Sequence, residues 1–308
     1  MNYYDTIEQY EDSFVYLDAE LIQLDIGEFK GEFGHFNLPS CMVETRTSAA
    51  KHIHKSAIGK GKVSLIFPNN KESDAMQING FTMASDNQII DIGGEGVHAV
   101  IPANFNVSVI VLEQQKLEQE LGQNIANSEN LRRQAVKEID KFIIANNVRY
   151  ALRQFENKII QKSPIAKYDL ESSLYTMASL YLHNNVLKSG LCKKSIKAIE
   201  KRRVLELLFS LPIEQLNVSN LAKEAFLSLR KLHYLCTATW GLTPNQLLMN
   251  SRFRRINRVL SAEDLDNKPL ISHLLRSLGV TNISRFNLAY QRLFGETPKQ
   301  TMLRTKYK

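Results

Sequence analysis

Two stretches in the last third of the chain end in the same way. Residues 227–244 and 279–298 both finish with an aromatic residue, glycine, one further residue, threonine and proline. A shift of 54 positions superposes Trp240 on Phe294. A local pattern that recurs at a fixed distance indicates a duplicated structural unit. Any fold of this chain must therefore accommodate the unit twice.

The shared ending predicts that one helix stops and another starts. Gly241 and Gly295 can adopt the left-handed conformation that closes a final helical turn. Thr243 and Thr297 suit the N-cap of the next helix, and the proline after each of them suits its first position. A glutamine three residues after each threonine completes the capping-box pattern.

Each copy contains two helical patterns before this ending. Residues 219–226 and 270–279 form the first pattern, and a short turn separates it from the second. In the second pattern of the first copy, Leu232, Cys236 and Trp240 are spaced by four, which predicts one buried stripe. Helix, turn, helix is the unit whose second helix can lie in the major groove of DNA. The sequence thus predicts two groove-binding units.

One continuous helix is predicted to join the two units. Residues 245–260 place Leu248, Phe253, Ile256 and Leu260 at helical spacing. The arginines around this stripe are Arg252, Arg254, Arg255 and Arg258. A rigid connector would set the separation of the two groove-binding helices, and major-groove segments on one face of B-form DNA lie roughly 34 Å apart.

Charge is distributed unevenly along the chain, whose formal net charge is +7. Residues 201–308 hold 18 lysines and arginines against 7 acidic residues, whereas residues 1–200 hold 21 against 25. This asymmetry predicts nucleic acid or another anionic partner for the C-terminal part. Charge alone leaves open a basic domain without such a partner.

Composition and length favour a soluble globular protein with more than one domain. The chain has 308 residues, and 44% of them are hydrophobic. No apolar run approaches the roughly 18 residues that span a bilayer, and the acidic N-terminus differs from a secretory signal. Cys41, Cys192 and Cys236 are too few and too dispersed for a disulfide framework or a cysteine metal site. We expect a cytoplasmic protein with no membrane partner, no cofactor and no metal.

The sequence pattern changes from β-type to helical near residue 112. Residues 14–112 contain many short β-type runs separated by turn residues, which predicts an antiparallel barrel or sandwich. Helical patterns follow, and one of them spaces its apolar residues by four, three and four. These residues are Leu170, Leu174, Met177 and Tyr181. They form either a dimer seam or a face that packs within the chain, because two heptads are too few to define a coiled coil.

Residues 212–304 resemble the DNA-binding domain of the AraC/XylS family of transcription regulators. The matching residues of the first unit are Leu221, Ala222, Ser228, Leu232, Gly241, Thr243 and Pro244. Those of the second unit are Ile271, Leu274, Gly279, Ser284, Phe286, Tyr290, Phe294, Gly295, Thr297 and Pro298. Arg252 falls where the family places an arginine on the connecting helix. The sequence departs from the family at Cys236, usually phenylalanine, at Leu275, usually alanine, and at Leu288, often arginine.

The resemblance implies an N-terminal cupin-like β-barrel that senses a small molecule, a helical dimerisation region, and control of promoters by recruiting RNA polymerase. We therefore predict an α+β chain. Its parts are a β-barrel sensor domain at 1–112, a helical linker or dimerisation region at 113–210 and a double helix-turn-helix domain at 211–308. The expected partners are double-stranded DNA, RNA polymerase, a second copy of the chain and an effector whose identity does not follow. Activation is favoured over repression on the resemblance alone.

The candidate DNA-binding residues project from the outer faces of the two groove-binding helices. In the first unit they are Arg230, Lys231, His233 and Tyr234, and in the second they are Asn282, Ser284, Arg285 and Asn287. Arginine and histidine can donate to guanine, asparagine can pair with adenine, and serine or tyrosine can reach phosphate oxygens. Leu288 offers contact with a thymine methyl group instead of a hydrogen bond. An ordinary solvated helix face is the alternative for each set.

Other motifs carry weaker chemistry. His52 and His54 alternate along a predicted strand and so share a face, but no carboxylate follows at a metal-site spacing. We interpret them as structural or ligand-facing residues. GKGK at 59–62 and GGEG at 93–96 read as hairpin turns, because neither has the full spacing of a phosphate loop. No catalytic constellation is present in the sequence.

Two other functions remain open from sequence. The N-terminal barrel could be an enzyme, such as an isomerase or dioxygenase, fused to a DNA-binding domain. It could instead bind another regulatory protein, which would make a small ligand unnecessary. A bound transition metal lost on His52→Ala would favour the enzyme, and a retained small molecule would argue against the protein partner.

Overall fold

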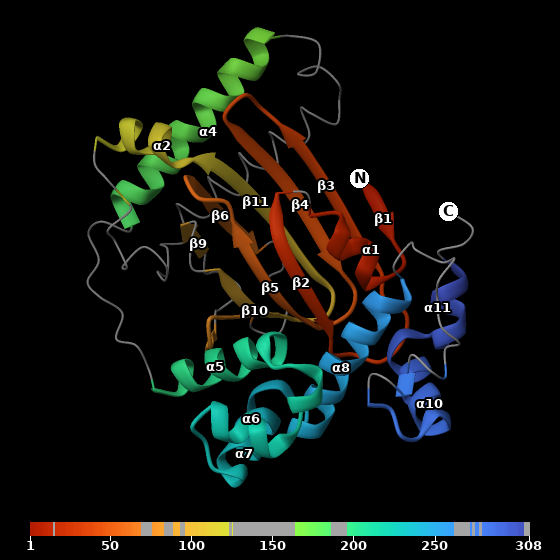
Figure 1. Cartoon of the computed structure of the whole chain (residues 1–308). Coiled ribbons are helices and arrows are strands. Elements are labelled where there is room, and N and C mark those ends of the chain that lie inside the picture. Colours follow the sequence, from red (N-terminus) through yellow and green to blue (C-terminus); the bar gives the residue numbers. More distant parts are fainter. Residues whose placement is uncertain are drawn as a thin grey trace.

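The computed structural model describes residues 1–14, 16–68, 76–82, 89–92, 96–122, 125, 164–185, 196–261, 272, 275–276 and 279–304. Figure 1 shows β-strands in the middle of the molecule. Helices α2 (Gln114–Leu121) and α4 (Pro164–Asn185) lie at one end of the strands, and the C-terminal helices lie at the other. None of the described helices has the length and apolar character needed to cross a membrane.

The strands form two antiparallel sheets. The first contains, in spatial order, β1 (Asn2–Tyr4), β3 (Gly31–Asn37), β4 (Cys41–Ser48), β11 (Phe105–Glu113), β6 (Lys62–Pro68) and β9 (Ile89–Ile92). The second contains β2 (Leu17–Gln23), β5 (His52–Ile58), β10 (Val97–Ile101), β7 (Gln77–Ile78) and β8 (Phe81–Thr82). The α+β class is confirmed, but the predicted barrel is not closed. The ladders of the described strands end at β1 and β9 and at β2 and β8, so no hydrogen-bonded ladder joins the sheets.

Alternation along the strands places one apolar core between the sheets. Val107, Val109 and Val111 of β11 face this core, which also receives apolar side chains from β5, β7 and β10. Ile110 and Leu112 point to the opposite face of the same strand and belong to another core. A period of two therefore makes the first sheet apolar on both faces.

Helix α4 covers the outer face of the first sheet. Leu174 and Tyr175 are fully buried there, and the Tyr175 hydroxyl donates to the Ser40 carbonyl at 2.8 Å. Leu170 and Met177 pack against the same core, so this apolar face is used within the chain and the packing alternative to a dimer seam is confirmed for it. The fourth residue of the predicted seam, Tyr181, has a side chain outside the described set.

The outer face of the second sheet packs on the C-terminal helices. Ile22 of β2, Ile53 of β5 and Val100 of β10 share a core with helix α5 (Ile196–Ser210). The same core contains Leu232 and Trp240, so the N-terminal strands and the first helix-turn-helix unit bury one continuous apolar surface.

The helices predicted for the first C-terminal unit are present, and so is the second helix of the second unit. A short 3-10 helix, η3 (Ile213–Gln215), leads into α6 (Val218–Glu224) and α7 (Leu229–Trp240), and α8 (Pro244–Leu260) follows. The second unit contains α10 (Ile283–Phe294), and α11 (Pro298–Arg304) comes after it. Of the helix predicted at 270–279, only Ser272, Leu275, Arg276 and Gly279 belong to the described residues.

Both unit endings adopt the predicted local geometry. Gly241 and Gly295 each have φ of +75°, the left-handed conformation that side chains with a Cβ rarely adopt. Thr243 caps α8, and a full capping box with Gln246 is formed. At the second ending the Thr297 amide donates to a Gln300 side-chain oxygen at 2.8 Å. The local prediction is confirmed in both copies.

Helix α8 is the predicted rigid connector. Its first half contributes Leu247 and Leu248 to the core of the first unit. Its second half contributes Phe253, Ile256 and Leu260 to the core of the second unit. Seventeen residues at 1.5 Å per residue make the connector about 25 Å long.

Candidate functional site

Helix α7 presents the first candidate DNA-binding face. Ser228 caps the helix, and Leu232, Cys236 and Trp240 bury one stripe of it. The structure exposes all four candidates of this unit, which are Arg230, Lys231, His233 and Tyr234. Tyr234 is 68% exposed, so a large ring stands in solvent on this face.

One residue of this face is already paired inside the chain. The Lys231 ammonium group forms an ion pair with Glu200 of α5. Lys231 is half exposed while Glu200 is largely buried, so the carboxylate is held in place and the lysine reaches toward it. Lys231 must release this partner before it can contact a phosphate.

Helix α10 presents the second candidate face. Ser284 and Arg285 are exposed on it, and so is Leu288, which is 62% exposed. Asn282 is the N-cap of the helix, because its side-chain oxygen accepts from the Arg285 amide at 2.9 Å. The NH₂ group of Asn282 and the second lone pair of its oxygen remain available to a base. Asn287 is half-buried, and its Oδ1 has no hydrogen-bond partner among the described residues.

The N-terminal domain caps the C-terminal ends of both candidate helices. The ammonium group of Lys51 donates a hydrogen bond to the Trp240 carbonyl at 3.2 Å. The Gln23 side-chain amide donates to the Leu293 carbonyl at 2.8 Å, and the Gly27 amide reaches the same carbonyl at 3.2 Å. The last carbonyls of a helix lack intrahelical donors, so these contacts satisfy groups that would otherwise need water. Sequence patterns did not single out Gln23 or Lys51, since both partners lie far along the chain.

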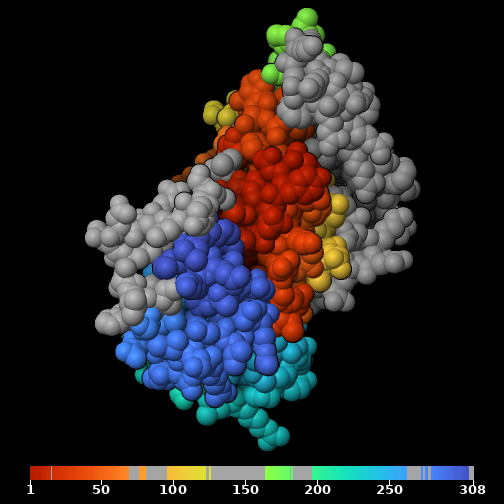
Figure 2. Space-filling model, turned by 90° about the vertical axis from the view of Figure 1, so that its right-hand side faces the viewer, coloured from red at the N-terminus to blue at the C-terminus, as the bar shows by residue number. Residues whose placement is uncertain are grey.

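Acidic residues of helix α1 (Ile7–Asp12) and strand β2 bind the connecting helix. The Arg254 guanidinium lies 3.1 Å from a Glu11 oxygen and 3.0 Å from a Glu20 oxygen. The Arg258 guanidinium lies 2.7 Å from an Asp12 oxygen and 3.4 Å from Glu11. Burial raises the pKa of Glu11, while the two arginines lower it. Figure 2 shows the second unit, in blue, lying directly against the N-terminal residues in red.

The other arginines of the connecting helix also bind within the chain. Arg252 donates to the Leu216 carbonyl at 3.1 Å, and Arg255 donates to the Phe209 carbonyl at 2.9 Å. The four arginines of the connecting helix therefore bind partners within the chain and stabilise the fold. Acidic side chains of the N-terminal half thus pair with basic side chains of the C-terminal half within one molecule.

A buried carboxyl group at this interface gives a pH-dependent prediction. Burial raises the pKa of Glu8 from its ordinary 4.5 to about 7, against the effect of Arg304 at 3.7 Å. Between pH 4.5 and about 7, the folded protein therefore binds more protons at Glu8 than the unfolded chain does. The contribution of Glu8 to stability falls as pH rises through this range. We expect its contribution to the free energy of unfolding to fall by up to about 3 kcal/mol.

The measurement is urea unfolding of wild type and Glu8→Gln at pH 4.5, 6 and 8. The variant should gain stability relative to wild type as pH rises. Burial lowers the pKa of His52 to about 4, so His52 makes the stability of both proteins rise with pH. The difference in stability between the two proteins at each pH therefore reports on Glu8. A difference that stays constant with pH would contradict the assignment.

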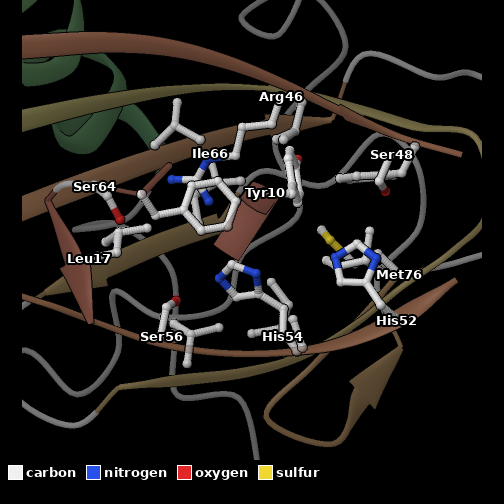
Figure 3. A pocket seen from close by; sticks show the side chains of 18 of the residues that line it. Tyr10, Leu17, Arg46, Ser48, His52, His54, Ser56, Ser64, Ile66 and Met76 are labelled. Atoms are coloured by element: carbon white, nitrogen blue, oxygen red, sulfur yellow. The ribbon is translucent and has the colours of Figure 1, made fainter. Parts of the chain in front are cut away.

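A cavity lies in the N-terminal domain between the two sheets and helix α1. Figure 3 shows Tyr10, Arg46, His52, His54 and Ser48 around it. Most of its remaining lining is apolar, from Phe14, Leu17, Ile66, Met76, Ile78, Val97, Ala99, Ile101, Phe105, Val107, Val109 and Val111. About 70 Å³ of its space is open to water-sized molecules. Concave apolar sites with a few polar groups are the usual form of small-molecule sites.

The polar groups of the cavity are strongly desolvated. Arg46 pairs with the buried Glu44 and stacks over the Phe14 ring at 4.5 Å. Burial lowers the pKa of Arg46 to about 10. Burial also lowers the pKa of His52 to about 4 and that of His54 well below its ordinary value, so both imidazoles are neutral at physiological pH. The sequence correctly placed His52 and His54 on one face, and Arg46 was missed because a lone arginine on a strand carries no signal.

The remaining sequence candidates do not form a second site. In the described part of the chain, no three His, Cys, Asp or Glu residues lie close enough to hold a metal ion. The GKGK stretch forms the turn between β5 and β6, with Gly61 at φ of +75°. Residues 93–95 of the GGEG stretch lie outside the described residues, as does Cys192.

Comparison with known proteins identifies the C-terminal part. Residues 221–304 match a family model described as a helix-turn-helix domain. The search of curated protein sequences gave no match. The match covers helices α6, α7, α8 and α10, so this part of the chain contains a helix-turn-helix domain.

Solved structures with similar folds were also found. The AraC-like transcriptional activator CuxR is 11% identical, with 90% of this chain and 99% of CuxR covered and a TM-score of 0.46. A probable AraC family regulator from Rhodopseudomonas palustris is 21% identical, with 34% and 96% covered and a TM-score of 0.32. ToxT from Vibrio cholerae is 11% identical, with 94% and 97% covered and a TM-score of 0.29. The helix-turn-helix match at residues 221–304 agrees with the resemblance found in the sequence for this part of the chain.

Proposed function

We propose that the chain controls transcription by binding promoter DNA through α7 and α10 in response to a small molecule held in the N-terminal cavity. The observation that carries the proposal is the pair of exposed helix faces within the matched helix-turn-helix domain. The proposed DNA contacts are Arg230, Lys231, His233, Tyr234, Asn282, Ser284, Arg285 and Asn287. Action as an activator that recruits RNA polymerase, as a cytoplasmic homodimer, rests on the family resemblance.

The proposed division of labour has three parts. Residues 1–112 bind the effector, residues 113–210 link and dimerise, and residues 211–308 bind DNA. Among the solved structures compared are ToxT bound to an unsaturated fatty acid, with 9% identity and a TM-score of 0.27, and ToxT bound to a naphthalenyl butenoic acid. Non-catalytic ligand binding is proposed for the cavity here.

Helix α1 supplies the physical connection between the cavity and the DNA-binding domain. Tyr10 lines the cavity, and the next residue, Glu11, binds Arg254 and Arg258 of the connecting helix. On strand β5, Lys51 caps α7 and its neighbour His52 lines the cavity. A ligand that shifts α1 or β5 would therefore alter contacts that hold both candidate DNA-binding helices.

Arg230→Ala tests the DNA-binding assignment. The exposed guanidinium is placed to donate to guanine, and its loss should weaken specific binding by roughly 1–3 kcal/mol and relax preference at one base position. Sites mapped genome-wide with the full-length protein would supply the duplexes, and competition binding would measure the change. Lys223→Ala, an exposed basic residue on α6, is the control and should leave base preference intact. Unchanged affinity and preference in Arg230→Ala would remove this residue from the interface.

The enzyme alternative is tested with the same protein. A stoichiometric transition metal that disappears in His52→Ala would favour catalysis in the N-terminal domain. Small-molecule mass spectrometry of purified protein addresses the protein-partner alternative, because a retained ligand supports the effector site.

A further inference from the structure

The cavity contains polar atoms whose hydrogen bonds are not made within the protein. The Nε of Arg46 and the Oγ of Ser48 are buried and lack partners among the described residues. Both residues lie on β4 and line the cavity (Figure 3). Buried polar groups in folded proteins normally have partners, so these two donors on the cavity wall can each bind an acceptor oxygen of a ligand.

The charge of the cavity is already balanced. The positive charge of Arg46 is paired with Glu44, which is 1% exposed. His52 and His54 add no charge at neutral pH, because burial holds both imidazoles in the neutral form. A carboxylate entering this site would leave one buried negative charge without a counter-charge, and burying an unpaired ion is strongly unfavourable. An uncharged ligand meets no such penalty.

One acceptor is also available on the wall. The Nδ1 of His52 lies 3.0 Å from the Ala50 carbonyl. A carbonyl can only accept, so Nδ1 carries the proton and Nε2 is left as an acceptor. A ligand hydroxyl can donate to such a nitrogen, whereas a carboxylate cannot.

We propose that the cavity binds a small, uncharged, mainly apolar molecule that carries a carbonyl or hydroxyl oxygen, which accepts from Arg46 and Ser48. This assignment rests on the proposed role of the N-terminal domain as the effector site. The open space is about 70 Å³. At roughly 10–15 Å³ for each water-sized group, that corresponds to about five to seven such groups, the size of a compact molecule.

The test compares matched six-membered-ring probes on the full-length protein near neutral pH. Calorimetry would measure binding of cyclohexanone, cyclohexanol and cyclohexanecarboxylate. We expect both uncharged probes to bind at least about tenfold more tightly than the carboxylate. Equal or tighter binding of the carboxylate would overturn the proposal, and so would the absence of saturable binding by both uncharged probes.

Variants of two cavity serines locate the ligand oxygen. Ser48→Ala should weaken cyclohexanone binding several-fold, because it removes an unpartnered donor. Ser64→Ala is the control, since Ser64 lines the cavity but its hydroxyl is not among the unpartnered atoms. Equal losses in the two variants would overturn the assignment of the oxygen to Ser48.

A charge variant tests the electrostatic argument directly. Glu44→Gln leaves Arg46 without its counter-charge and should reverse the preference, so that cyclohexanecarboxylate binds more tightly than cyclohexanone. An unchanged preference in a variant that melts as one folded species would overturn the argument. Failure of the proposed regulatory function would instead appear as absence of DNA enrichment by the wild-type protein, a result independent of these titrations.

Discussion

Replacing Glu11 with alanine is expected to lower the free energy of unfolding by about 3–4 kcal/mol. Glu11 is 6% exposed, binds both Arg254 and Arg258, and accepts from the Leu21 amide at 2.6 Å. Its removal leaves buried donors and positive charge without their main acceptor, and breaking a buried ion pair from one side costs about 3–5 kcal/mol. Glu20 still contacts Arg254, which places the expected effect toward the lower end of that range.

Urea denaturation of Glu11→Ala measures this effect, and Asp12→Ala is the matched neighbour. Asp12 also binds Arg258, but its side chain is 60% exposed. Exposed ion pairs contribute about 0–1 kcal/mol, so the Asp12 variant should stay close to wild type. Similar small losses in both variants would show that the contact between α1 and α8 does not hold the two domains together.

Replacing Trp240 with alanine is expected to cost about 3–5 kcal/mol. Trp240 is 2% exposed and belongs to the core that joins the second sheet, α5 and the first helix-turn-helix unit. Its removal leaves a large cavity where three elements meet. The loss should therefore affect both the packing of α7 and its attachment to the N-terminal domain.

The duplication supplies the control for this prediction. Phe294 occupies the equivalent position of the second unit but is only partly buried, and it packs at the edge of two smaller cores. Phe294→Ala should cost about 2 kcal/mol, since less apolar area is removed from contact. Thermal and urea unfolding of both variants would measure the difference. A larger loss at Phe294 than at Trp240 would contradict the assignment of the main core to the first unit.

The two copies of the unit ending show which predictions succeed. Glycine, threonine, proline and glutamine act on groups within a few residues of themselves, so their pattern predicted both left-handed glycines and the Thr243 capping box correctly. The period of two in the N-terminal half likewise predicted a shared face for His52 and His54, and both line the cavity. The predicted barrel did not close, because strand pairing depends on which distant edges meet.

The candidate site also combines features that the sequence predicted with features that it did not. The exposed side chains of α7 followed from the spacing of Leu232, Cys236 and Trp240, whereas the partner of Lys231 did not. Arg254 and Arg258 read as part of a basic connector, but in the structure they bind carboxylates more than 230 positions earlier in the chain. The type of a residue determines which partners it can bind. The tertiary structure determines which of those partners lies close enough to be bound.

Local hydrogen bonds and apolar periodicity are encoded over a few residues, and they were enough to predict the first helix-turn-helix unit, the connecting helix, the second helix of the second unit and a β-rich N-terminal half. The docking of the N-terminal strands on both candidate helices and the neutral cavity around Arg46 depend on contacts between segments far apart in sequence. Burial then changes the chemistry of those contacts, because Glu8, His52 and Arg46 have ordinary pKa values in water and shifted ones only where the fold removes the solvent.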